Sequence, residues 1–225
     1  MNTDAMARFL TEFPNLLETL LVGAEMTVVV TLGGLLISVV LGLAGAMLRM
    51  AHQPALRAIG TFYVDVFRAV PVLTQLFIIY FGLAQVGLKL DPVPAAVLGF
   101  GINGGAYLTE VFRASIEAIH RGQSEAALAV GLTRLQSLRL IVLPQAMRIA
   151  LPPLGNFAIA LLKDTSVASS VAAPELTYRA HMLVNQTYLS PQIYLMVAAL
   201  YLTMSLPLSQ LVRRLERRLE RGRAT

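Results

Sequence analysis

Residues 26–47 read MTVVVTLGGLLISVVLGLAGAM, an apolar run without a charged side chain. A helix needs about 20 such residues to cross the hydrocarbon core of a bilayer. Glu18 and Glu25 precede the run, and Arg49 follows it. We therefore predict a first membrane span over about residues 16–48. The segment before it holds a single basic residue, Arg8, which is atypical of a cleaved signal peptide, so we expect the span to be retained.

The composition of the whole chain favours an all-α membrane protein. The 225 residues are 56% hydrophobic and 14% charged, and the mean hydropathy is +0.66. Soluble domains carry about 25% charged residues. Four further apolar blocks predict spans over about residues 58–86, 95–119, 149–172 and 192–212. We therefore predict a single transmembrane domain over residues 1–225, with about five spans embedded in the lipid bilayer.

The basic residues are distributed unevenly between the two sides that five spans define. Cytoplasmic loops of membrane proteins are enriched in Lys and Arg. One side holds only Arg8, Lys89 and Arg179. The other side holds Arg49, Arg57, Arg121, Arg134, Arg139, Arg148, Arg213, Arg214, Arg217, Arg218, Arg221 and Arg223. We predict that the N-terminus lies outside and the C-terminus in the cytoplasm. This topology explains the net charge of +5, so we expect no nucleic acid as a partner.

The sequence excludes several kinds of chemistry. It has no cysteine, which rules out disulfides and thiolate chemistry. Three histidines, His52, His120 and His181, stand far apart in the sequence, so we expect no metal site. A phosphate-binding loop needs Gly-Lys-Ser or Gly-Lys-Thr, but Lys89 and Lys163 each follow a leucine. We therefore expect that this chain is not an enzyme, hydrolyses no ATP by itself and binds no cofactor.

The polar segment of residues 120–148 contains signals for two short helices. Ser124 is placed to cap a helix that begins at Glu125. Gly131 is a natural C-terminal stop for that helix. Thr133 and Gln136 have the spacing of a capping box, which predicts the start of a second helix. We expect two helices joined by a glycine bend on the cytoplasmic side.

The second of these helices has an apolar face formed by Leu135, Leu138, Ile141 and Val142, and we expect Pro144 to end it. The element is too small to be an enzyme domain. Its shape suits docking into a groove on a partner protein. The alternative is an ordinary surface loop that only connects two spans.

Particular positions of this segment resemble the EAA motif of ABC importer membrane subunits. The matching residues are Glu125, Ala126, Ala127, Gly131, Ile141, Val142, Leu143 and Pro144. Other stretches resemble the signatures of the polar amino acid importer permeases, the histidine, glutamine and arginine group. These stretches contain Arg68, Pro71 and Gln75, then Ala106, Tyr107, Glu110 and Arg113, and finally LPPLGN (151–156) and LLKDTS (161–166). Ala69 and Val70 depart from the family's more usual Gly and Thr.

The resemblance implies a division of labour. It implies the type I, MetI-like permease fold in a bacterial inner membrane, and import of polar amino acids by alternating access. An ABC ATPase dimer, which holds ATP and Mg²⁺, would bind the loop through Glu125, Ala126, Ala127, Gly131, Ile141, Leu143 and Pro144. A periplasmic or extracellular binding protein would deliver the amino acid. A second permease, either identical or homologous, would complete the pore.

Charged and polar residues inside the predicted spans are the candidate substrate contacts, because such groups are costly in a bilayer. Glu110 and Arg113 share a helix face and either pair structurally or contact substrate. Local unwinding near residues 163–166 would aim several polar groups at one cavity. Asp164 could then accept from the substrate ammonium, while Thr165 and Ser166 hold its carboxylate. The candidate pathway residues are Lys163, Asp164, Thr165, Ser166, Glu110, Arg113, Tyr107, Asn103 and Gln75. The last three could equally hold helices together.

Three other functions compete with this interpretation. An ABC importer for another small polar solute would keep the EAA pattern and differ in its pocket. A secondary transporter or channel would often show inverted repeats, which the sequence lacks, and would leave the docking loop without a role. A membrane scaffold would leave Lys163, Asp164, Glu110 and Arg113 as an unexplained energetic cost.

Overall fold

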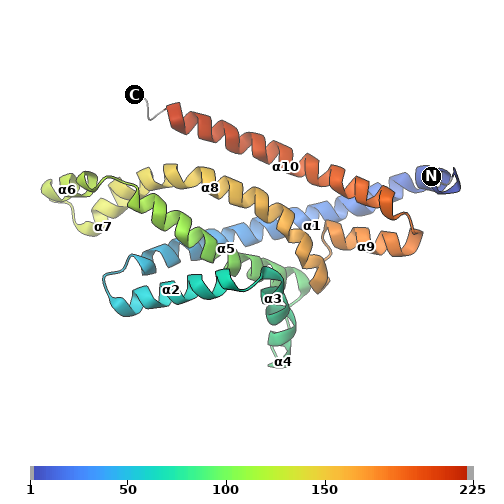
Figure 1. The fold of residues 1–225 in the computed structure, drawn as a ribbon, viewed down its shortest axis with the longest axis horizontal. Helices are drawn as coiled ribbons and strands as arrows, with labels where there is room; N and C mark the ends of the chain where they lie inside the picture. Colours follow the sequence, from blue (N-terminus) through green and yellow to red (C-terminus); the bar gives the residue numbers. More distant parts are fainter. Residues whose placement is uncertain (1–2, 222–225) are drawn as a thin grey trace.

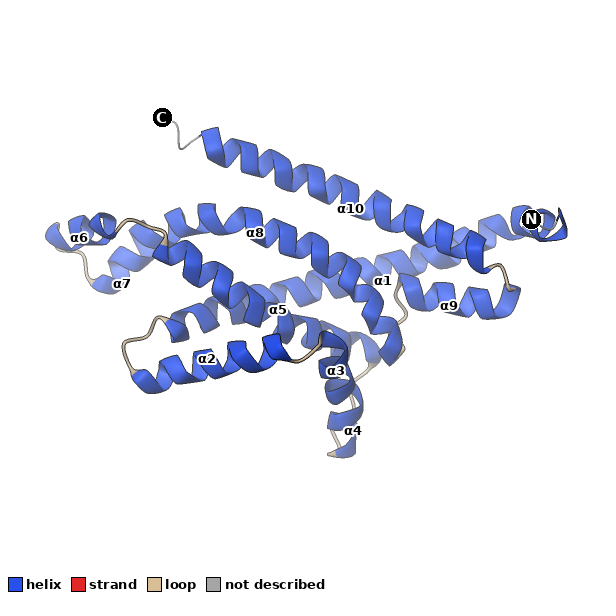
Figure 2. Ribbon diagram, viewed as in Figure 1, coloured by secondary structure: helices blue, strands red, loops and turns tan. Residues whose placement is uncertain are grey.

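The computed structural model describes residues 3–221, and all regular structure in that range is helical (Figure 2). The prediction of an all-α protein is confirmed. In Figure 1, α1 (Thr3–Arg49), α8 (Leu143–Asp164) and α10 (Ser190–Arg221) run along the length of the molecule. The helices α6 and α7 lie at one end, whereas α9 and the N-terminus lie at the other. Arg223, one of the basic residues predicted to lie on the cytoplasmic side, is outside the described residues.

Helix α1 packs along α5 (Pro92–Glu117) in the most extensive contact of the bundle. Glycines make this approach close: a Cβ on Gly42 would lie 2.7 Å from Cβ of Leu108. Ser38 donates to the carbonyl of Gly34 at 2.7 Å and lies 3.3 Å from the carbonyl of Gly101 across the interface. Small residues and hydroxyls are the usual means of helix association in membranes. The small residues of α1 and α5 therefore allow the two helices to pack closely.

The predicted second helix, 58–86, is broken. Helix α2 ends at Ala69, and the following helical segment turns away from it by 103°. Pro71 causes the break, because it has no N–H and forces the preceding Val70 into an extended conformation, with φ −94° and ψ 130°. The pieces are α2 (Pro54–Ala69), α3 (Val72–Phe77), the π-helix η1 (Ile78–Gly82) and α4 (Leu83–Gln85). Figure 1 shows α3 and α4 projecting to one side of the bundle.

Two side chains satisfy the carbonyl groups that this break leaves free. Gln75 donates through Nε2 to the carbonyls of Phe67 at 2.9 Å and Val70 at 2.8 Å. Asn103 on α5 donates to the same Phe67 carbonyl at 2.9 Å. Buried backbone carbonyls need such partners, above all where water is excluded. Gln75 and Asn103 thus stabilise the bend in this conformation.

Four other features of the helices differ from the sequence prediction. Helix α1 begins at Thr3 rather than near residue 16, and Pro14 lies inside it. The fourth predicted helix, 149–172, comprises α8 and then the 3₁₀ helix η3 (Thr165–Val171). The connection predicted over residues 174–191 contains α9 (Leu176–Thr187), and α10 continues past residue 212 to Arg221.

Within residues 3–221, two helices are long and apolar enough to cross a membrane, judged by length and composition. They are Met6–Arg49, with a mean hydropathy of 2.4, and Ser190–Leu219, with 1.7. The bent pair Pro54–Ala69 and Val72–Gln85 adds a third if it forms one broken span. Helices α5 and α8 do not meet the same criteria of length and apolar composition. Polar residues such as Asn103 and Glu110 lower the hydropathy of α5, which is covered by its neighbours and therefore needs less apolar surface.

The carboxylate of Glu175 joins three helices between the fourth and last predicted spans. Its side chain is fully buried and accepts hydrogen bonds from the backbone N–H groups of Thr177 at 2.8 Å and Tyr178 at 2.7 Å, at the start of α9. Tyr201 on α10 donates to it at 3.3 Å, and Leu176 donates to Thr27 on α1 at 3.2 Å. Burial raises the pKa of Glu175 to about 7, although the two backbone donors favour the charged form.

Stability should therefore decrease as the pH rises from acidic to neutral. The folded-state pKa of Glu175 lies above its ordinary value of 4.5, so the folded protein binds more protons between about pH 4.5 and 7. The associated loss of stability should be complete above the raised pKa. Glu175→Gln, which cannot ionise, should flatten this part of the profile of melting temperature against pH in detergent. Glu18→Gln, at an exposed carboxylate, is the control; identical profiles for wild type and Glu175→Gln would contradict the prediction.

Candidate functional site

The first helix of the polar loop is α6 (Arg121–Ala129), and it begins earlier than the sequence predicts. His120 is its N-cap: Nδ1 accepts from the N–H of Gly122 at 3.1 Å. Ser124 therefore lies inside the helix, and the prediction that it caps a helix beginning at Glu125 is wrong. The imidazole satisfies one of the free N–H groups of the first turn, so the helix can start four residues sooner.

The glycine bend follows the prediction closely. Gly131 has φ +86°, a left-handed conformation that strains any residue with a Cβ. Its N–H donates to the carbonyl of Leu128 at 3.0 Å, and Leu132 donates to Ala127 at 3.1 Å. This pair of hydrogen bonds is a Schellman motif. The predicted capping box of Thr133 and Gln136 is also present, so both ends of the bend are fixed by local hydrogen bonds.

The second helix does not end at Pro144. After α7 (Arg134–Ser137) the chain continues through a π-helical turn, η2 (Leu138–Val142), directly into α8. The N–H of Leu143 donates to the carbonyl of Leu138, five residues earlier. Proline is tolerated in the first turn of a helix, where its missing N–H needs no partner. The second helix of the loop is thus the beginning of one long helical segment that leads into the bundle.

The loop presents an apolar surface to the outside. Of the predicted apolar face, Val142 is buried against Ile116 and Ala146, but Leu135 is 73% exposed. The exposed apolar side chains at this end of the molecule are Leu128, Val130, Leu135 and Leu140. A cluster of this kind on a pair of capped helices is typical of a surface that another protein covers.

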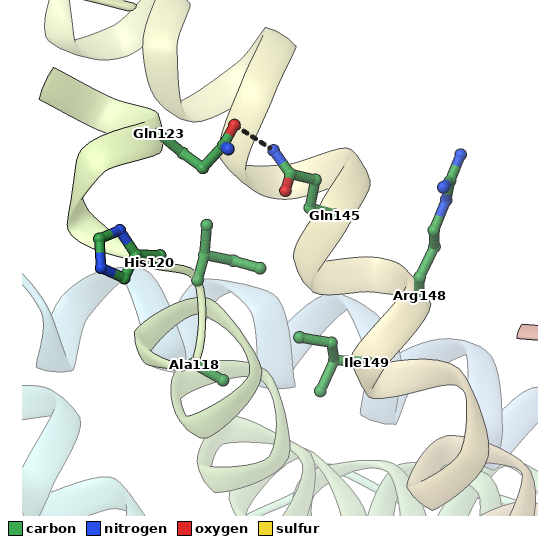
Figure 3. A pocket seen from close by; sticks show the side chains of 7 residues that line it. Ala118, His120, Gln123, Gln145, Arg148 and Ile149 are labelled. Carbon is green, nitrogen blue, oxygen red and sulfur yellow. Dashed lines mark hydrogen bonds between the residues drawn. The ribbon is translucent and has the colours of Figure 1, made fainter. Parts of the chain in front are cut away.

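A pocket of about 290 Å³ lies beside this loop, between α6, the end of α5 and the start of α8 (Figure 3). Its lining includes His120, Gln123, Gln145 and Arg148. Gln145 donates through Nε2 to Oε1 of Gln123 at 3.2 Å, which joins α6 to α8. In Figure 3, the Arg148 side chain points away from this hydrogen bond. Through the hydrogen bond between Gln123 and Gln145, a displacement of α6 would therefore also move the first turn of α8.

A network of charges joins α1 to α5 near the same end. Glu110 forms ion pairs with Arg113, at 2.8 Å, and with Arg49. Arg113 also pairs with Glu117 at 2.7 Å. Glu110 and Arg113 are thus paired in this structure, which is one of the two alternatives that the sequence leaves open for them. The sequence analysis placed Arg49 in a loop, but it lies in the last turn of α1, where its side chain reaches across to Glu110.

The polar residues predicted for α8 lie on its exposed face. Asn156, Ala160, Lys163 and Asp164 are all exposed, and their spacing places them on one side of the helix. The helix tightens from α to 3₁₀ at Thr165, in place of the predicted unwinding. Thr165 itself is fully buried and donates to the carbonyl of Leu162 at 2.7 Å, so its hydroxyl faces away from this surface. Ser166 is partly exposed beside it.

Tyr107 of α5 extends this polar face. Its ring stacks on that of Phe157 of α8, with centroids 5.3 Å apart and planes at 17°, and it remains 44% exposed. Gln75, by contrast, is 4% exposed and bonded to the bend described above. Lys163 and Asp164 are therefore exposed on the side of α8 whose Phe157 stacks on Tyr107, whereas Gln75 and Thr165 are buried and Asn103 is partly buried. Within residues 3–221, no three His, Asp or Glu side chains converge as a metal site would need.

These features define a class of protein: a membrane transport component with a polar face on its helices and an exposed apolar surface on the loop at one end. The chain belongs to the family of binding-protein-dependent transport system inner membrane components, which residues 38–221 match. It is 40% identical over 185 residues to the probable glutamine ABC transporter permease GlnM of Bacillus subtilis, covering 82% of this chain and 86% of that protein. It is 37% identical to the glutamine permease GlnP of Escherichia coli K12, covering 89% and 93%.

Solved structures agree with this assignment. An amino acid ABC transporter crystallised with histidines matches with a TM-score of 0.85 and 33% identity, over 97% of this chain and 100% of that one. The MetNI methionine ABC transporter in an inward-facing form matches with a TM-score of 0.66 over 87% and 96%. Because that identity is 21%, the likeness concerns the fold alone. The predicted MetI-like permease fold is confirmed.

Proposed function

We propose that this chain is the pore-forming subunit of a bacterial ATP-driven importer for polar amino acids. The exposed polar face of α8 carries the proposal: Lys163 and Asp164 lie on the surface of a helix in a membrane protein, on the side of that helix where Phe157 stacks on Tyr107. Charged side chains in such a position face a water-filled pathway or a partner. The names of the relatives, which are glutamine and amino acid permeases, support the same substrate class.

The two charges suit a zwitterion. An amino acid presents a carboxylate, which a cation or hydroxyl such as Lys163 or Ser166 can bind, and an ammonium, which Asp164 can bind. Charge-assisted hydrogen bonds of this kind are among the stronger polar contacts. A second permease, identical or homologous, would face α8 from the other side of the pathway. The exposed state of these side chains in the single chain is consistent with that arrangement.

The movement that drives transport would reach this chain through the polar loop of residues 120–148. A separate ATPase dimer, with its own ATP and Mg²⁺, would contact Glu125, Ala126, Ala127 and Gly131, while Ile141, Leu143 and Pro144 connect this contact to α8. Closure of the ATPase would push α6, and the Gln123–Gln145 hydrogen bond would pass this movement to α8. Alternating access around the polar face would follow. The basic side of the chain would lie in the cytoplasm, and a binding protein would deliver the amino acid outside.

The substrate site can be tested by Asp164→Asn. Loss of the negative charge should lower amino acid uptake by roughly 10- to 100-fold, because a hydrogen bond to a charged group contributes about 1.5–3 kcal/mol. The measurement is ATP-dependent uptake of labelled glutamine, histidine and arginine into proteoliposomes that contain the permease, its ATPase and its binding protein. Co-purification of the ATPase should be unaffected.

Asp91→Asn is the matched control, because Asp91 is exposed and makes no capping hydrogen bond at the start of α5. It should transport like the wild type. Unchanged uptake by Asp164→Asn would remove Asp164 from the substrate site. Uptake of a different small polar solute, with none of the amino acids transported, would identify the chain as an importer of another substrate class.

A further inference from the structure

Helix α10 continues beyond its last tertiary anchor as a basic extension. Val212 is the anchor: it is 5% exposed, and a Cβ on Gly155 of α8 would lie 2.6 Å from it, so the two helices touch there. The helix continues to Arg221, about nine residues or roughly 13 Å farther. Figure 1 shows this end of α10 diverging from the rest of the bundle. Residues 213–218 are called the basic extension below.

The side chains of this region separate into two faces. At roughly 100° per residue, Arg213, Arg217, Arg214 and Arg218 occupy a sector of about 140°. Leu211, Val212, Leu215 and Leu219 occupy an adjacent sector of about 100°. All four arginines are exposed, and Leu211 is 53% and Leu215 38% exposed. Among the described side chains, no carboxylate lies within ion-pair distance of these four guanidinium groups.

We propose that the basic extension of α10 binds the phosphate groups of anionic phospholipids at the membrane surface. This inference goes beyond the transport function and requires only that α10 spans the bilayer. The extension directly follows the span predicted over residues 192–212 and lies at the C-terminal end of the long apolar helix α10, so its arginines emerge where lipid headgroups lie. A cluster of four or more basic residues next to a membrane helix is attracted to an anionic surface, and guanidinium groups bind phosphate oxygens in pairs.

The two faces favour lipid over solvent as the neighbour of this segment. A helix with leucines on one side and arginines on the other can rest at the interface, with its leucines against acyl chains and its arginines at headgroup level. If the segment only projected into water, the exposed side chains of Leu211 and Leu215 would have no apolar neighbour to cover them. The alternative neighbour is another protein, such as the ATPase, and the experiment separates the two.

The test is native mass spectrometry of the purified transporter complex with equal amounts of phosphatidylglycerol and phosphatidylcholine of the same acyl chains. The wild type should retain phosphatidylglycerol preferentially, and added salt should reduce this preference. Because each basic residue near an anionic surface contributes roughly a fivefold factor, Arg213→Gln combined with Arg217→Gln should lower the preference by about tenfold or more. A preference equal to that of the wild type would overturn the proposal.

Three control variants make the result specific. Arg57→Gln combined with Arg139→Gln removes two exposed arginines outside the basic extension and should lower the preference much less than Arg213→Gln combined with Arg217→Gln. Arg213→Lys combined with Arg217→Lys keeps the charge and should retain most of the preference, which separates loss of charge from misfolding. Glu216→Gln removes the acidic residue of the extension and should strengthen the preference. If the glutamine variant instead loses co-purified ATPase and keeps its phosphatidylglycerol, the extension docks on protein and the lipid proposal is wrong.

Discussion

Replacing Gly131 by valine should reduce coupled transport by at least tenfold. Gly131 has φ +86°, and a side chain with a Cβ costs about 1–2 kcal/mol in the left-handed region, more when it is β-branched. Valine would break the Schellman hydrogen bonds and redirect α7 relative to α6. The docking surface would then no longer match its partner. ATP-dependent uptake in proteoliposomes and the amount of co-purified ATPase measure the effect.

Two variants isolate the cause of this effect. Gly87 also has a positive φ, of +90°, and lies between α4 and α5, away from the loop. Gly87→Val therefore carries a similar backbone cost without touching the docking element, and it should transport nearly as well as the wild type. Gly131→Asn should also retain much of the activity, because asparagine tolerates the left-handed region. Equal losses in Gly87→Val and Gly131→Val would refute a specific coupling role.

The parts of the site that the sequence predicts correctly depend on neighbouring residues. Gly131 ends a helix and Thr133 starts one through hydrogen bonds that span three to five residues, so their spacing is visible in the sequence. The Glu110–Arg113 pair is of the same kind, since residues three apart share a helix face. Such features need no knowledge of the rest of the bundle.

The features that the sequence analysis misses depend on distant partners. The break at Pro71 is stabilised by Asn103, 36 positions away from the Phe67 carbonyl that it binds. Proline alone does not predict such a break, because Pro14, Pro152 and Pro153 lie inside continuous helices of the same chain. Arg49 joins the charge network only because α1 and α5 pack together there. The cap by His120 was missed for another reason: imidazole is an uncommon N-cap.

The close contact between α1 and α5 at Gly42 should be a sensitive point for stability. Gly42→Val places a branched side chain where even a Cβ would lie 2.7 Å from Cβ of Leu108 and 3.1 Å from its backbone carbonyl carbon. Neither atom is the end of a flexible side chain, so α1 and α5 must separate. Overpacking of this kind costs about 1–3 kcal/mol, and sometimes more. We expect a lower melting temperature in detergent and a smaller yield of folded protein.

The separation would also affect interactions that lie along the same helix pair. Ser38, which is fully buried, would lose its contact with the Gly101 carbonyl, and Arg49 would move away from the partly exposed Glu110. Gly82→Ala is the control, because a Cβ there would meet only one atom of Ile78, at 3.7 Å. It should change stability by less than about 0.5 kcal/mol. If Gly42→Val melts at the same temperature as Gly82→Ala, the close α1–α5 contact does not determine the stability of the bundle.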